Sequence, residues 1–527
     1  MTRIRSAAIA ASLVLPATLF AAAPPAFAAA PAGTKPASEA PAFTFTGRYA
    51  NGGAEVSAVL GSRLYVIGDA ATLDIVSIAN PAAPKRTTTI DLTRFGAAIT
   101  SVAARDGYVA VALPAADKTD PGTVVILDAG GAVLTSLTVG ANPDMLTFDK
   151  NAKRLVVANE GEPNSYAPQD DPEGSVSVID VKRAVSGKKD AVTAVTFTDF
   201  NRGAAGSAEL PADVRIFGPG ATVAQDLEPE YVTIDGDRAF VTLQENNAIA
   251  EIDLKKGRVV AIRALALKDH SAAGNGLDAS DRDGRVNIAS WPVFGAPLPD
   301  AVASFTVKGS TYLITANEGD ARDWPGYAEE ARIGSGAYVL DPTAFPNAEA
   351  LRAPAALGRL NASRASGDTD GDGDYDRIVT SGTRSATIWS ADSTRIWDSG
   401  DILERATAAA YPANFNASNE NNILDDRSDN KGPEPEGVAV GEIGKRTYAF
   451  VGLERIGGFA VFDVTDPAKA SFVQYVNSRD FAADPSSPAT DSGPEVLSFV
   501  SAKDSPSGRP LVVVSNEVSH TVSIWTA

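Results

Sequence analysis

The chain has 527 residues, of which 66 are acidic and 46 basic, so its formal net charge is −20. Charge of this sign repels nucleic acid and anionic membrane surfaces, and we therefore expect cations as partners instead. The sequence contains no cysteine, which excludes disulfides, thiol nucleophiles and zinc–thiolate sites. Stability must then come from a large buried core or from bound metal.

The amino terminus predicts an export signal. Arg3 and Arg5 precede an apolar stretch that ends in Ala26-Phe27-Ala28, a pattern typical of a cleaved signal peptide. The stretch is short and contains Pro16, so we expect no membrane span. We expect a periplasmic or secreted monomer, with a signal peptide over residues 1–28, a flexible linker over 29–41 and a single domain over 42–527.

A repeated unit occupies most of the remaining chain. Its clearest copy opens at Glu230 and has strands at 231–234 and 239–243, joined by the turn Asp235-Gly236-Asp237 and followed by a third strand at 249–254. Asp and Gly between β-branched strands are typical of a β-hairpin turn. The unit recurs with openings at Glu55, Asp144, Asp300, Glu436 and Glu495, and a further copy over residues 99–128 keeps the strands without the acidic residues.

These seven units predict an all-β fold, a β-propeller with seven blades. The unit that opens at Asp300 takes residues 339–341 as its third strand. Residues 357–399 contain further apolar segments and would make eight blades if they form a blade of their own. The last unit ends after its third strand, and residues 43–49 alternate like a strand. We expect this amino-terminal strand to pair beside 521–525 and close the ring, because an open edge is an aggregation hazard.

Carboxylates recur at two positions of the units, one before the first strand and one after the second. In an antiparallel hairpin, the start of one strand and the end of the next lie at the same edge. We therefore expect both carboxylates of a blade to face one mouth of the central axis. These mouth carboxylates are Glu160, Glu230, Glu245, Glu318, Glu436, Glu454, Glu495 and Glu517, together with Glu55, Asp69, Asp144 and Asp300.

Two interpretations of the mouth carboxylates remain open. They can accept backbone N–H hydrogen bonds and brace the ring. Alternatively, some of them form a site for a cation or a substrate, since crowded carboxylates need compensating charge. Basic residues lie beside several of them in the sequence. The candidate catalytic residues of such a site are Glu318, Arg322, Arg427, Glu454 and Arg455.

A run of alternating aspartates predicts a separate metal site. Its first half matches the pattern of a calcium-binding loop, with Gly373 at the turn. Val379 stands where such a loop carries its bidentate glutamate, so we expect calcium in a β-hairpin loop without flanking helices. We place this loop between strands at 357–360 and 377–380, on the face opposite the mouth. Its ligands would be Asp368, Asp370, Asp372, Asp374 and Asp376.

Several longer motifs resemble a known family. They are Ala158-Asn159-Glu160-Gly161-Glu162-Pro163, Ala316-Asn317-Glu318-Gly319-Asp320-Ala321-Arg322, Lys431-Gly432-Pro433-Glu434-Pro435-Glu436-Gly437 and Gly452-Leu453-Glu454-Arg455. With the aspartate run, they resemble the choice-of-anchor I domain, also labelled mesenchyme-specific cell-surface glycoprotein-like. The resemblance implies a β-propeller-type extracytoplasmic domain, often found with cell-surface anchors or phosphoesterase domains and sometimes labelled alkaline phosphatase.

Two functions are compatible with this sequence. The first is a calcium-binding envelope or extracellular module that binds or scaffolds other molecules. The alternative is a calcium-dependent phosphoesterase, alkaline phosphatase-like or phytase-like. Its mouth carboxylates would hold calcium while Arg322, Arg427 or Arg455 stabilises the developing charge. The ligand or substrate stays open in both.

Overall fold

The structure, a computed structural model, describes residues 40–166 and 170–527. The predicted signal peptide and nearly all of the predicted linker lie outside the described residues. Residues 41–527 form one compact unit. No helix in the described ranges is both long and apolar enough to cross a membrane.

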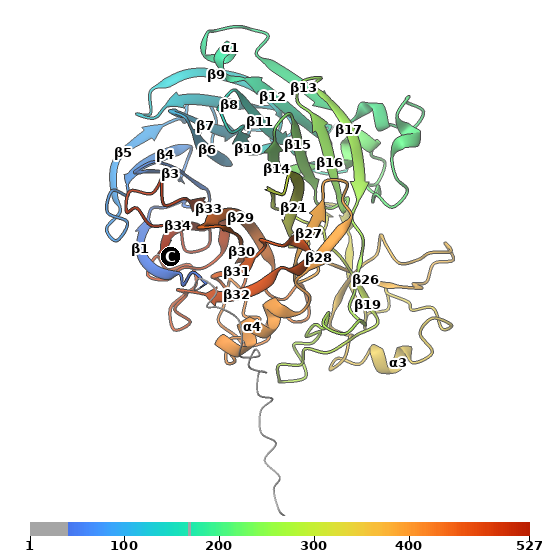
Figure 1. Ribbon diagram of the computed structural model, residues 1–527. Coiled ribbons are helices and arrows are strands. Elements are labelled where there is room, and N and C mark those ends of the chain that lie inside the picture. Colours follow the sequence, from blue (N-terminus) through green and yellow to red (C-terminus); the bar gives the residue numbers. More distant parts are fainter. Residues whose placement is uncertain (1–39, 167–169) are drawn as a thin grey trace, which may run out of the picture. The chain divides into compact units, whose positions relative to one another are not determined.

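Within this unit the fold is all-β, as the sequence predicts. The described residues contain seven sheets of four antiparallel strands, which Figure 1 shows arranged around a common centre. In the first four sheets the strands follow one another in chain order. These sheets are β2 (Ser57–Leu60), β3 (Arg63–Gly68), β4 (Thr72–Ser77) and β5 (Lys85–Asp91); β6 (Ser101–Arg105), β7 (Tyr108–Leu113), β8 (Pro121–Asp128) and β9 (Val133–Ala141); β10 (Pro143–Phe148), β11 (Arg154–Asn159), β12 (Ser175–Asp180) and β13 (Val192–Thr196); and β14 (Pro229–Asp235), β15 (Arg238–Leu243), β16 (Ala248–Asp253) and β17 (Arg258–Ala264).

The last three sheets include the two departures from this simple order. One sheet is interrupted by a long insertion, and another takes its outer strand from the amino terminus. They are β20 (Val302–Val307), β21 (Ser310–Ala316), β27 (Ala386–Ser390) and β28 (Arg395–Asp398); β29 (Pro435–Ile443), β30 (Arg446–Leu453), β31 (Phe459–Asp463) and β32 (Ser471–Val476); and β33 (Pro494–Val500), β34 (Leu511–Asn516), β35 (Thr521–Thr526) and β1 (Thr44–Ala50).

The core lies between neighbouring sheets. The first strand of each sheet contacts the first strand of the next, and β33 contacts β2. Second strands such as β3, β7 and β34 are almost continuously apolar and buried, because other sheets cover both of their faces. Outer strands such as β5 are exposed and polar. One cluster packs Val156 and Val178 of one sheet against Val241 and Ile252 of the next.

The predicted pairing of the amino-terminal strand is confirmed. Strand β1 pairs antiparallel with β35, with Tyr49 opposite Val522. The hydroxyl of Tyr49 donates to Asp74 Oδ2 at 2.6 Å, and the ring of Phe43 lies 5.2 Å from that of Phe450. Strand β1 therefore covers the edge of β35 that the carboxyl-terminal unit leaves unpaired.

One sequence-based strand assignment after β21 is wrong, and the alternative of a blade at residues 357–399 is not realised. Residues 339–341 are not the third strand of their unit, because β27 pairs with β21 and Leu340 makes only a single bridge to Tyr375. Residues 357–399 do not form an eighth blade. Strands β27 and β28 complete the sheet of β20 and β21, whereas β26 (Ile378–Ser381) pairs in parallel with β19 (Val293–Ala296). The apolar segments between residues 339 and 399 have similar lengths, so the sequence alone does not indicate which of them pairs with β21.

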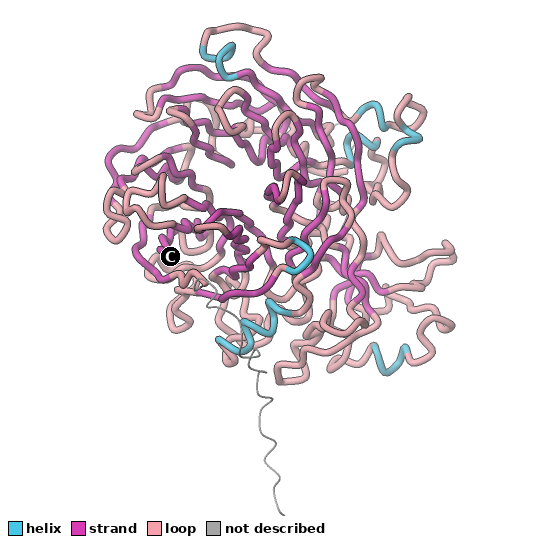
Figure 2. Tube along the Cα trace, viewed as in Figure 1, coloured by secondary structure: helices cyan, strands magenta, loops and turns pink. Residues whose placement is uncertain are grey.

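Short elements occupy the insertion and the connections. As Figure 2 shows, most of the helices lie at the periphery of the sheets. The remaining strands are β18 (Lys268–Asp269), which pairs with β19; β22 (Asp323–Trp324) with β23 (Tyr327–Ala328); and β24 (Glu330–Arg332) with β25 (Asn361–Ser363). The α-helices are α1 (Val181–Val185), α2 (Val223–Asp226), α3 (Ala348–Leu351) and α4 (Ile402–Ala410).

Candidate functional site

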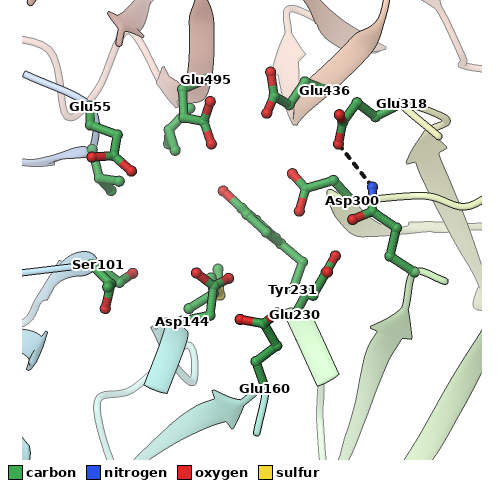
Figure 3. A pocket seen from close by; sticks show the side chains of 15 residues that line it. Glu55, Ser101, Asp144, Glu160, Glu230, Tyr231, Asp300, Glu318, Glu436 and Glu495 are labelled. Atoms are coloured by element: carbon green, nitrogen blue, oxygen red, sulfur yellow. Dashed lines mark hydrogen bonds between the residues drawn. The ribbon is translucent and has the colours of Figure 1, made fainter. Parts of the chain in front are cut away.

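An acidic cavity lies where the first strands begin. Its volume is about 150 Å³. Figure 3 shows carboxylates from several sheets converging on it, as the repeat pattern predicts. No lysine, arginine or histidine lines it in the described part of the chain. The lining carboxylates are Glu55, Asp144, Glu160, Glu230, Asp300, Glu318, Glu436 and Glu495.

Proline and a β-bulge position four of these carboxylates. Asp144, Glu230, Glu436 and Glu495 each follow a proline that opens the first strand of a sheet. In all four sheets the pairing register shifts directly after that proline. A bulge bends the strand and changes the direction of a side chain. The Pro-acid pair therefore turns the carboxylate toward the cavity.

Three other mouth carboxylates, Glu245, Glu454 and Glu517, lie close to the lining. Glu245 raises the pKa of Glu230, Glu454 raises that of Glu436, and Glu517 raises that of Glu55, in each case after the larger effect of burial. Glu454 accepts a hydrogen bond from Asn419 at 2.7 Å. Each of these three residues is therefore close enough to a lining carboxylate to repel it. Asp69 is not among the lining residues.

Burial and mutual repulsion shift the titration of the lining carboxylates. Burial, followed by repulsion from Glu517 and Asp144, raises the pKa of Glu55 to about 7. Burial, followed by repulsion from Glu162, raises the pKa of Asp144 to about 7. The pKa values of Glu230 and Glu436 rise further for the same reasons. The cavity therefore favours either protons or a bound cation over free carboxylates.

Hydrogen bonds do not satisfy every oxygen of the mouth carboxylates. Glu230, Glu245 and Glu436 each keep a buried Oε2 atom that accepts no hydrogen bond. Glu160 and Glu318 do accept side-chain bonds, from Asn142 at 2.6 Å and from Gln244 at 2.9 Å. Buried oxygen atoms without donors are expensive, so the unpartnered ones point to a ligand.

Tyr231 is a lining residue that the sequence analysis missed. Its side chain reaches into the middle of the carboxylates (Figure 3). Burial raises its pKa, and the neighbouring carboxylates Asp300 and Glu495 raise it further. The residue after the opening carboxylate is aromatic in this unit alone, whereas it is Met145 in the unit before. This departure from the repeat could have indicated Tyr231 as a candidate site residue.

Four of the five candidate catalytic residues meet beside the cavity, around a carboxylate that was not predicted. Glu434 Oε2 lies 3.1 Å from Lys431 Nζ and 2.8 Å from Arg455 Nε, and its Oε1 lies 2.5 Å from Arg427 Nη2. Lys431 Nζ also lies 3.0 Å from Glu318 Oε1, and Arg455 Nε 3.1 Å from Glu454 Oε2. We call these six residues the Lys431 cluster.

Charge within the Lys431 cluster is largely compensated. Burial alone would raise the pKa of Glu434, but Lys431, Arg427 and Arg455 hold it far below its usual range. Carboxylates of Glu318, Glu434 and Glu454 approach closely enough to hold a metal. Because the ammonium of Lys431 already contacts two of them, a cation would have to compete with it.

Arg322 lies apart from the Lys431 cluster. Its guanidinium pairs with Asp226 and lies 3.4 Å from Glu228, and its side chain is only 1 % exposed. Its planar group also lies over the ring of Phe217, 4.6 Å from the ring centre. This arginine is thus committed to a buried structural pair rather than to the cavity.

The aspartate run forms two overlapping groups. Asp368, Asp370 and Asp376 each place a carboxylate oxygen within 4.8 Å of the others, and Asp374 and Asp376 do so with Asp341. Asp372 belongs to neither group. Asp368 accepts backbone N–H bonds from Gly371 and Gly373, which wraps the loop around this carboxylate.

The location of the aspartate loop differs from the prediction. The segments at 357–360 and 377–380 do not pair with each other, so the loop is not the turn of a hairpin. It belongs to the insertion that leaves β21 after Ala316 and rejoins the sheet at Ala386, opposite Ala316 in the ladder. Ala316 is two residues before Glu318, which lines the cavity. The insertion therefore leaves the sheet at the mouth edge and not at the opposite edge.

Comparison with known proteins matches residues 58–467 to the choice-of-anchor I domain. The chain belongs to the choice-of-anchor I domain family. This confirms the family that the sequence motifs indicate. The matched range includes most of the lining carboxylates and the whole Lys431 cluster, but not Glu55 or Glu495.

Two curated relatives share part of this choice-of-anchor I chain. A mesenchyme-specific cell surface glycoprotein of Strongylocentrotus purpuratus is 29% identical over 276 residues, 46% of this chain and 35% of that protein. Gigasin-3a of Magallana gigas is 31% identical over 184 residues, 32% of this chain and 64% of that protein. The matches thus leave a substantial part of each relative uncovered.

Solved structures of low similarity also align with the chain. The Cps50 (Swd1) β-propeller domain of Myceliophteria thermophila gives a TM-score of 0.44 at 8% identity, over 92% of this chain and all of that one. A chain of a mitotic checkpoint complex gives 0.43 at 9% identity, over 92% of this chain and 94% of that one. At these scores the alignments support no conclusion about function or partners.

Proposed function

We propose that this choice-of-anchor I chain is an extracytoplasmic binding module, a closed β-propeller of seven blades whose acidic mouth captures calcium. The observation that carries the proposal is the convergence of eight carboxylates on one cavity that no basic side chain lines in the described residues. Neutralising them requires protons or cations. Calcium fits because it prefers six to eight oxygen ligands in flexible geometry.

An extracellular location supports this choice of cation. One relative is described as a cell surface glycoprotein, and the amino-terminal sequence has the pattern of an export signal. Extracellular calcium modules bind with dissociation constants on the order of 0.1 to 1 mM. Calcium can therefore occupy the acidic cavity outside the cell even if its affinity for the cavity is low.

The aspartate loop is proposed as a second calcium position. Asp368, Asp370 and Asp376 provide a compact set of carboxylate oxygens, and Gly371 and Gly373 adopt positive φ values that allow the loop to wrap tightly. Calcium there would raise the melting temperature by mass action. Chelation would lower it.

A binding role is favoured over a phosphoesterase. Arg322 and Arg427, proposed to stabilise a transferring phosphate, are engaged in ion pairs with Asp226 and Glu434. Arg455 is likewise paired with Glu434. A phosphate in the cavity would thus depend on bound calcium alone. Turnover of a generic phosphomonoester that requires calcium and these arginines would favour the enzyme instead.

Calorimetric calcium titration of the double variant Glu230→Gln/Glu436→Gln tests the mouth site. Glutamine keeps the size of each side chain but removes the charge, so we expect at least a tenfold loss of affinity at the mouth, about 1.4 kcal/mol. The chelated variant should melt at a higher temperature than chelated wild type, because repulsion is relieved.

Asp370→Asn is the matched control, since it removes one carboxylate from the aspartate loop and leaves the mouth unchanged. It should reduce calcium binding at the loop alone. A double glutamine variant that binds calcium as wild type does, and melts at a lower temperature, would refute the mouth site and restore the bracing interpretation.

A further inference from the structure

A third group of acidic side chains lies outside the mouth and the aspartate loop. Asp278 and Asp283 belong to the connection between β18 and β19, and Asp425 to the connection between α4 and β29. One carboxylate oxygen of each lies within 4.8 Å of the corresponding oxygens of the other two. The proposed function makes no use of this group.

The group is buried and incompletely hydrogen-bonded. Asp278 is fully buried, Asp425 is 4% exposed, and the side chain of Asp283 is 6% exposed. Asp283 Oδ2 and Asp425 Oδ2 are buried and accept no hydrogen bond. The remaining oxygen of Asp425 accepts from the hydroxyl of Ser428. Each unpartnered oxygen needs a donor or a cation to offset its desolvation.

The one arginine that forms an ion pair with these three carboxylates in the described residues is a weak partner. Arg285 Nε lies 3.6 Å from Asp283 Oδ2, and the arginine side chain is 69% exposed. Because water screens the exposed arginine, it compensates the buried carboxylate only weakly. The three carboxylates also lie close enough together to repel one another. A dication would remove the repulsion that the arginine leaves in place.

Surrounding contacts hold the two connections in register before any ion binds. Glu404 accepts the N–H of Asp278 at 3.1 Å and pairs with Arg384 at 2.6 Å. Arg384 in turn donates to the carbonyl of Ser428 at 2.8 Å. Arg359 bridges Asp281, at 3.0 Å, and Asp429, at 2.9 Å. These contacts position the carboxylates in the absence of an ion, as a binding site requires.

We propose that Asp278, Asp283 and Asp425 form a calcium site that fastens the connection at residues 278–287 to the segment at 425–430. All three ligands are carboxylates, which suit a hard cation, whereas zinc prefers nitrogen and sulfur ligands. Backbone oxygens or water would complete the coordination. The ion joins parts of the chain that are far apart in sequence, so it adds stability to the native state alone.

Trp291 supplies a local probe for this site. Its indole N–H donates to the carbonyl of Leu277 at 3.2 Å, one residue before Asp278. Terbium replaces calcium at oxygen sites, and a nearby tryptophan sensitises its emission. Excited at a wavelength that tryptophan absorbs and tyrosine does not, the full chain with terbium should emit, and added calcium should quench that emission. Trp291→Phe should remove the emission that this site contributes while leaving the heat of calcium binding at the site intact.

The test compares Asp425→Asn and Asp283→Asn with the loop variant Asp370→Asn. The loop control is necessary because Trp291 packs in the same hydrophobic cluster as Tyr375. We expect each of the first two variants to weaken calcium competition at least about tenfold, since affinity depends on the number of charged ligands. Asp283→Asn alters the side chain beside an exposed arginine, so it serves if Asp425→Asn does not fold.

Two results would overturn the proposal. In the first, both single variants, Asp283→Asn and Asp425→Asn, emit as strongly as wild type and show the same competition by calcium. In the second, emission disappears in Asp370→Asn and persists in both Asp283→Asn and Asp425→Asn. The mouth variant Glu230→Gln/Glu436→Gln should leave the signal unchanged, so this proposal and the proposed function can fail independently.

Discussion

At the residue scale, Lys431 compensates two buried carboxylates at once. Its Nζ lies 3.0 Å from Glu318 and 3.1 Å from Glu434, and the residue is 7% exposed. Lys431→Met keeps much of the side-chain volume but leaves both acids without this partner. We expect a loss of about 3 to 5 kcal/mol in the free energy of unfolding, because breaking a buried pair leaves uncompensated charge.

Urea unfolding measures this loss, with Lys445→Met as the control. Lys445 is exposed, and the same substitution there should change the free energy of unfolding by less than about 0.5 kcal/mol. Equal effects of the two substitutions would mean that the Lys431 cluster contributes nothing to stability.

At the scale of elements, β1 contributes through the face that it buries. Phe43, just before β1, is 4% exposed and packs on Phe450 and Phe459, whereas Phe45 within β1 is 44% exposed. Phe43→Ala should lower the free energy of unfolding by about 3 kcal/mol, since it removes a buried aromatic ring. Phe45→Ala is the matched control and should cost clearly less, in spite of its contact with Trp525.

Chemical denaturation of the two alanine variants gives this comparison directly. A Phe43→Ala variant as stable as wild type would show that β1 adds little to the fold beyond covering the edge of β35. Unchanged stability in both variants would argue that the amino-terminal strand pairs only loosely.

At the scale of the whole molecule, the acidic cavity couples stability to pH. Folding raises the pKa of Glu55 and Asp144 to about 7 from ordinary values of 4.5 and 3.8. The folded state therefore binds these protons more tightly than the unfolded chain. Their contribution is fully present below the unfolded pKa values and is lost as pH rises through about 7.

Scanning calorimetry with chelator present checks this coupling. The melting temperature should be higher at about pH 5.5 than at about pH 8, and saturating calcium should reduce the difference because it displaces the protons. Glu55→Gln should reduce the difference as well. A melting temperature that falls on acidification in chelator would mean that the lining carboxylates stay ionised and paired.

The amino-acid sequence by itself determined the repeating local structure. Apolar strands alternate with Asp/Gly turns, as at 231–243, and such hairpins depend on residues close in sequence. The same regularity placed a carboxylate before the first strand in six of the seven units, so the meeting of Glu230, Asp300 and Glu436 followed from hairpin geometry and repetition. The pairing of β1 could be predicted because the carboxyl-terminal unit lacks a fourth strand.

Only the tertiary structure decided what happens between distant, non-repeated segments. Three contacts are of this kind: β26 pairs with β19, Arg322 pairs with Asp226, and Asp425 approaches Asp278. In none of them does the surrounding sequence contain a pattern that indicates the partner. These contacts depend on how the insertion packs against the sheets. Local periodicity cannot specify such packing, because many arrangements bury the same apolar residues and differ only in which polar groups meet.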